Sequence, residues 1–73
     1  MTIGVQIVSL PDRKYVVAEL WRGDKQIAEV SNEEGDFRVE FYILDGQKEL
    51  NLSLEDLLSA LNLAKRKLSY NGN

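Results

Sequence analysis

The 73-residue chain contains no cysteine and no histidine. Their absence excludes disulfide bonds, thiolate catalysis, Cys/His zinc sites and imidazole acid–base chemistry. Small secreted domains usually depend on disulfide bonds, so the sequence favours a cytoplasmic protein. The first fourteen residues lack the features of a signal peptide, and no apolar stretch approaches the ~18 residues that span a bilayer. We therefore expect no membrane association.

Motifs that carry chemistry are also missing. The sequence has no glycine-rich phosphate loop, no metal-binding motif and no serine placed with a base in a recognised arrangement. We therefore expect no enzyme activity, no cofactor and no metal ion.

The composition is that of an ordinary globular domain, with 44% hydrophobic and 29% charged residues. Acidic residues outnumber basic ones by 12 to 9, giving a net charge of −3, which argues against nucleic acid as a partner. We expect a single domain over residues 1–70 and a flexible tail over residues 71–73.

Four segments are typical of β-strands, because they are rich in β-branched and aromatic residues and alternate in polarity. They span residues 2–10, 14–22, 25–31 and 36–43. Gly23-Asp24, between the second and third segments, predicts a tight hairpin. Asp45-Gly46 is a further turn signal, after which residues 48–52 either add a short edge strand or lead directly to the helix.

A helix is predicted after Ser53, whose hydroxyl can cap the first turn. Asp56 lies near the positive end of the helix dipole, and basic residues lie near the other end. Apolar residues at helical spacing run from Leu54 to Leu68. The predicted fold class is α+β: a four-stranded antiparallel meander with one C-terminal amphipathic helix packed on one face.

The alternation assigns residues to the two faces of the sheet. The face expected under the helix leucines contains Val16, Ala18, Leu20, Ala28, Val30, Phe37, Val39, Phe41 and Ile43. A helix is about 10–12 Å across and four strands about 19 Å, so one helix leaves the other face open. We expect that face to bind a partner through Tyr15, Val17, Glu19, Trp21, Ile27, Glu29, Arg38, Glu40 and Tyr42.

Two interpretations of this helix-free face remain open. Aromatic residues concentrate in protein interfaces, which favours a partner, either another protein or a second copy. Cross-strand aromatic pairs also stabilise an open sheet with no partner. Glu19, Glu29 and Glu40 approach one another if neighbouring strands align, but a flat face offers no desolvated pocket for catalysis.

Several segments resemble a group of short, uncharacterised bacterial proteins. The resemblance rests on Leu20-Trp21, on Ala28-Glu29-Val30-Ser31, on Val39-Glu40-Phe41-Tyr42 and on the leucine-rich segment 54–61, and covers about residues 16–68. It implies a bacterial source and a ββββα domain, and no assigned activity.

The sequence thus predicts a small non-catalytic protein-binding domain. Small acidic proteins without a catalytic site are typical of stoichiometric inhibitors, such as immunity proteins, antitoxins and phage anti-defence proteins. The alternatives are a homodimer formed by two helix-free faces and a nucleic-acid-associated protein that uses Lys65, Arg66 and Lys67.

Overall fold

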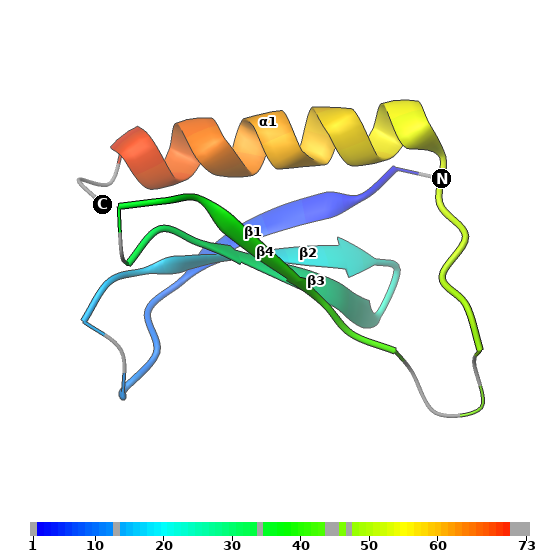
Figure 1. Ribbon diagram of the computed structural model, residues 1–73, viewed down its shortest axis with the longest axis horizontal. Coiled ribbons are helices and arrows are strands. Elements are labelled where there is room, and N and C mark those ends of the chain that lie inside the picture. The colour runs from blue at the N-terminus through cyan, green and yellow to red at the C-terminus, as the bar shows by residue number, and fades with distance from the viewer. Residues whose placement is uncertain (1, 13, 34, 44–45, 47, 71–73) are drawn as a thin grey trace.

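The computed structural model describes residues 2–12, 14–33, 35–43, 46 and 48–70. Four antiparallel strands form one sheet in the order β1-β2-β3-β4, and a single helix packs on one face, as Figure 1 shows. The predicted α+β meander is confirmed. The elements are β1 (Gly4–Val8), β2 (Val17–Arg22), β3 (Lys25–Ser31), β4 (Arg38–Phe41) and α1 (Leu54–Tyr70).

The strand bounds follow the pairing. β3 has the predicted bounds. β1, β2 and β4 are shorter than predicted, since alternation continues beyond the residues that have a partner strand. The described residues between 48 and 52 form no strand and lead to α1. Asp45 and residues 71–73, on which a turn and a flexible tail were predicted, lie outside the described residues.

A two-residue hairpin joins β2 to β3, as predicted. Arg22 pairs with Lys25, and Gly23 at the first turn position has φ 64°. No non-glycine residue among those described has a positive φ, so the positive angle falls on Gly23 alone, as in a type II′ turn.

A β-bulge after this hairpin changes the face of the sheet on which one side chain of β3 lies. Leu20 pairs with Ala28 and Trp21 with Gln26, which leaves Ile27 as the extra residue. A bulge of this kind interrupts the alternation of side chains. Ile27 is 1% exposed and belongs to the same core cluster as Ala28. The placement of Ile27 on the helix-free face was therefore wrong.

The start of α1 is capped as predicted. The Ser53 Oγ accepts a hydrogen bond from the Asp56 N–H at 3.3 Å, and the Ser53 carbonyl accepts one from the Leu57 N–H at 3.0 Å. Glu55 and Asp56 lie in the first turn and Lys67 in the last, so charges at both ends match the helix dipole.

The core lies between α1 and the first three strands. Its buried residues are Ala18, Leu20, Ile27, Ala28, Val30, Ala60, Ala64 and Leu68, with Ile3, Val5 and Ile7 of the first strand segment packed against them. Four of the eight buried residues are alanines, whose small side chains let the helix approach the sheet closely. α1 contacts β1, β2 and β3.

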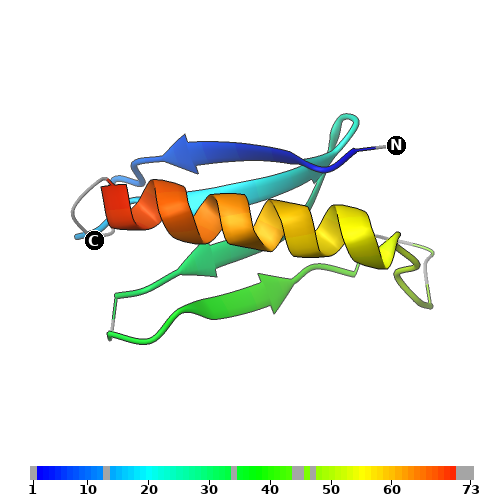
Figure 2. The ribbon, with the colours of Figure 1, turned by 90° about the horizontal axis from the view of Figure 1, so that it is seen from above.

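The helix does not cover β4, which corrects the predicted core. Figure 2 shows β4 lying clear of α1. All four residues of β4 are exposed, and Val39 and Phe41 keep 43% and 41% of their surface. One helix is about 10–12 Å across, whereas four strands are about 19 Å across. α1 therefore cannot cover all four strands of the face on which it packs. The uncovered apolar side chains are Phe37, Val39, Phe41 and Ile43 beside the sheet edge, and Leu54 and Leu58 on α1.

Replacing two isoleucines tests whether Ile27 is buried under α1 and whether the β4 side of the sheet is left uncovered. Ile27→Ala should lower the free energy of unfolding by about 2–5 kcal/mol, because the side chain is buried under α1. Ile43→Ala is the matched control and should change it by less than about 0.5 kcal/mol, since Ile43 is 62% exposed. Urea unfolding of dilute samples measures both. Equal losses, or a larger loss at Ile43, would contradict this packing.

Candidate functional site

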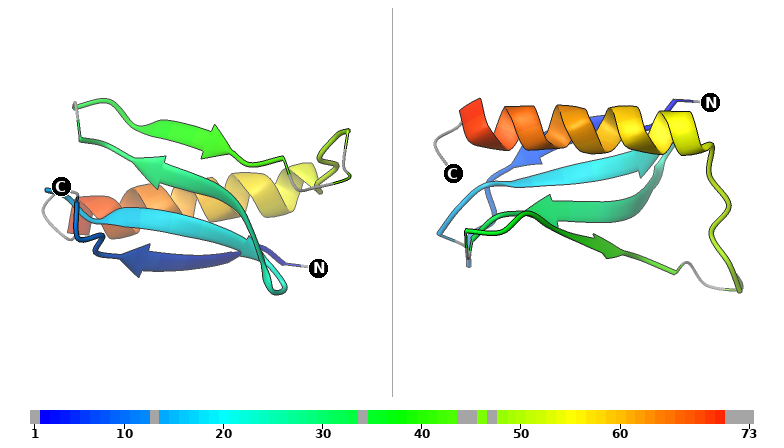
Figure 3. Two further views of the ribbon diagram at one scale, coloured as in Figure 1. Left: turned by 90° about the horizontal axis from the view of Figure 1, so that it is seen from below. Right: turned by 45° about the horizontal axis from the view of Figure 1, so that its top comes forward.

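The strand register aligns three glutamates across the helix-free face. Glu19 pairs with Glu29, and Glu29 pairs with Glu40, while Gln6 of β1 continues the same line beside Glu19. Residues directly opposite in an antiparallel sheet share a face, with Cβ atoms about 4.5–5.5 Å apart. Figure 3, left, shows the sheet from this side, with the helix behind it. We call Glu19, Glu29 and Glu40 the acidic row; their approach was predicted from the sequence and is confirmed.

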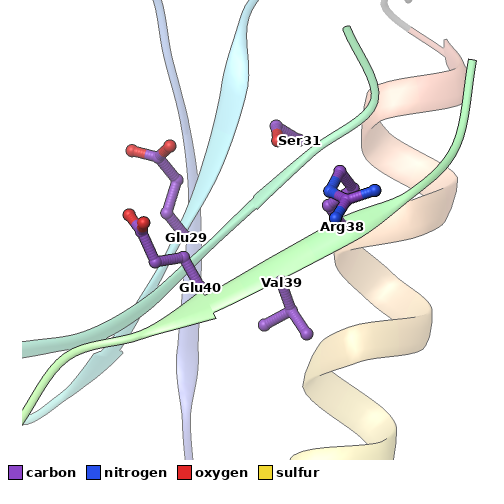
Figure 4. Close-up of a pocket in the computed structure, with 5 residues that line it drawn as sticks. All are labelled: Glu29, Ser31, Arg38, Val39 and Glu40. Carbon is purple, nitrogen blue, oxygen red and sulfur yellow. The ribbon is translucent and has the colours of Figure 1, made fainter. Parts of the chain in front are cut away.

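The acidic row places like charges side by side. Glu29 lies between the other two carboxylates and is 8% exposed. In Figure 4, Glu29 and Glu40 point the same way, and Val39 points away from them, towards the other face. The two glutamates line a shallow hollow with Ser31 and Arg38. Like charges directly opposite each other are an unfavourable pairing in a sheet.

Trp21 lies on the same face as the acidic row and is hydrogen-bonded to it. The Trp21 Nε1–H donates a hydrogen bond of 3.1 Å to the Glu19 Oε1. The N–H at the edge of the indole therefore has a hydrogen-bond partner, and the side chain as a whole is half-buried. The spacing of two residues along one strand indicated a shared face, but the hydrogen bond was not predicted. Trp21 also lines a second shallow hollow together with Gly4 and Gln6.

Two of the predicted partner-binding residues offer no surface. Ile27 faces α1, as described above, and Val17 is 0% exposed. Val17 lies on the central strand β2, opposite Val8 of β1. The expectation that these two side chains lie open was wrong.

The remaining predicted residues keep some surface on or beside this face. Tyr15 precedes β2 and is half-buried, with the Lys14 Nζ 5.4 Å from the centre of its ring. Tyr42 is half-buried and follows β4, where its N–H donates to the Ile27 carbonyl at 2.9 Å. Arg38 and Glu40 are exposed. The accessible part of the predicted surface is therefore centred on Trp21, the acidic row and Arg38.

The described residues contain neither a metal-binding cluster nor a membrane-spanning helix. No group of three or more Asp or Glu residues in the described ranges could hold a metal ion, the acidic row included. Across the same ranges, α1 is not long and apolar enough to cross a bilayer.

Of the basic residues near the C-terminus, Lys65 places its Nζ 5.6 Å from the centre of the Phe37 ring. This cation–π contact lies on the opposite side of the sheet from the acidic row.

Comparison with known proteins gives no match: no protein-family model, curated protein or solved structure matches the chain. The resemblance to short bacterial proteins stays a prediction.

The repulsion in the acidic row can be measured through Glu40, whose side chain is exposed. Glu40→Gln should raise the free energy of unfolding by about 0.2–1 kcal/mol in dilute, low-salt solution, because one like-charge neighbour of Glu29 is removed. The gain should shrink in 1 M salt, where the Debye length falls to about 3 Å. Glu49→Gln, an exposed acid outside the row, is the control. A gain that is equal for both variants, or independent of salt, would contradict repulsion within the row.

Proposed function

We propose that the protein is a small, non-catalytic protein-binding domain that uses its helix-free face to bind a basic surface of another protein. The observation that carries the proposal is the acidic row. Three carboxylates lie side by side, with Glu29 almost buried between the other two, although like charges are an unfavourable pairing in a sheet. Departures from local stability rules are expected at functional sites.

The row has the properties of an electrostatic docking surface. A line of carboxylates on an open sheet attracts a positively charged partner and fixes its orientation. Trp21 adds a large amphipathic side chain at one end of the row, and tryptophan is enriched among residues that dominate binding energy. Arg38 lies at the opposite side of the row and discriminates against partners that carry a cation there.

Within this class, the chemistry favours a stoichiometric inhibitor. A small acidic domain can occupy the basic cleft of a nucleic-acid enzyme, as immunity proteins, antitoxins and anti-defence proteins do. Direct binding of nucleic acid is less well supported, because the negative face repels phosphate and Lys65 is engaged by Phe37.

A homodimer through two helix-free faces is also less well supported. Packing those faces together would bring the acidic rows of both copies into one seam. Carboxylates brought together in this way lose water and repel one another, which is unfavourable.

The proposal is tested by affinity capture from a bacterial lysate with three forms of the protein. The row variant E19Q/E29Q/E40Q should lose the protein that the wild type captures, and W21A should weaken its binding by more than about 2 kcal/mol in a subsequent titration. The control variant D12N/E49Q/E55Q removes the same number of charges elsewhere and should retain binding. The proposal fails if the control loses the captured protein as fully as the row variant does, or if W21A costs less than about 0.5 kcal/mol.

A further inference from the structure

In the described part of the chain, one edge of β4 has no neighbouring strand. β4 lies at the end of the sheet order and pairs with β3 on its other side. The Tyr42 N–H donates to the Ile27 carbonyl, so at Tyr42 the backbone faces β3. Backbone groups in an antiparallel strand alternate between its two sides. Those of Val39 and Phe41 therefore point outward, away from β3.

The side chains beside this edge are apolar and uncovered. Phe37, Val39 and Phe41 are each 40–43% exposed on the side of the sheet that carries α1. The opposite edge differs, because Val5 and Ile7 of β1 are half-buried against the core under the helix. An exposed apolar edge strand is a template for pairing with another strand.

We propose that two copies of the chain pair through β4, antiparallel about a two-fold axis at Val39. This joins two four-stranded sheets into one continuous sheet and keeps both helices on the same face. The outward backbone groups of Val39 and Phe41 then bond to the second copy, and Phe37 lies opposite Phe41 of the second copy.

Among axes at Arg38, Val39 and Glu40, the charges on β4 favour the one at Val39. With the axis at Val39, Arg38 lies opposite Glu40 of the second copy, and the symmetry makes the same pair twice. An axis at Arg38 would oppose two arginines, and an axis at Glu40 would oppose two glutamates, both of which are unfavourable. In the described part of the chain, neither Arg38 nor Glu40 makes a hydrogen bond, ion pair or ring contact through its side chain. The proposed pairing supplies a partner to both.

This self-association does not rest on the proposed function, because its backbone pairing uses a sheet edge; it shares Arg38 and Glu40 with the helix-free face and leaves Trp21 and Glu19 accessible. It is also distinct from a dimer of two helix-free faces. Trp21 lies on β2, two strands away from the proposed seam, so its emission should not change on dimerisation through β4. A dimer of helix-free faces would bury the indole and shift its emission to the blue.

Sedimentation equilibrium over about a hundredfold concentration range, with tryptophan emission recorded on the same samples, provides the test. The wild type should associate from 8.3 kDa to twice that mass. R38E and E40R should each weaken the dimer by at least about tenfold, because two attractive pairs become repulsive. The double reversal R38E/E40R should restore it. E40R changes the net charge from −3 to −1, so long-range repulsion falls and any weakening reflects the local pair.

V39K provides a second route that does not involve the ion pairs. It places two lysines opposite each other at the axis and should abolish the dimer, while unfolding shows the monomer still folded, since Val39 is exposed. The proposal is overturned by a wild type that stays monomeric throughout, by a dimer whose tryptophan emission shifts to the blue, by a double reversal that fails to recover, or by a V39K protein that still dimerises.

Discussion

The structure depends on a mismatch of width: one helix must cover a sheet of four strands. A helix with its side chains is about half as wide as four strands, so it packs over part of one face and leaves the other face open. α1 lies on β1, β2 and β3, where Leu20, Ile27 and Leu68 are fully buried. Two regions lie outside that contact: the β4 edge on the helix side and the acidic row on the other side, where Glu19 and Glu40 keep accessible surface while Glu29 is buried.

These two accessible regions differ in chemistry and so in what they can bind. The β4 edge offers backbone hydrogen-bonding groups and apolar side chains, with alternating Arg38 and Glu40 on its far face, and its pattern is complementary to itself. The acidic row offers carboxylates, which attract cations, and Trp21 beside it donates a hydrogen bond to Glu19. In the dimer that we propose, Arg38 and Glu40 would lie at the seam, and Trp21 and Glu19 would remain for the protein partner that we propose.

Much of the fold could be predicted from local sequence rules. The hairpin at Gly23-Asp24, the Ser53 cap and the alternation that aligned the acidic row all follow from residues near one another in the chain. The face on which Ile27 lies could not be predicted, because a bulge depends on the register in which two strands pair, which the local sequence does not specify. The exposure of Val39 and Phe41 could not be read from alternation either, since the position of α1 across the sheet is set by the small alanines at their contact. The Trp21 bond to Glu19 joins two side chains whose rotamers no pattern specifies.

Residue-resolved amide hydrogen exchange in dilute solution tests most directly whether β4 is an open edge. The N–H groups of Glu40 and Tyr42, which face β3, should be protected, and those of Val39 and Phe41 should exchange fast. Equal protection of all four amides in dilute solution would contradict the account, because it would mean that another part of the chain already covers this edge.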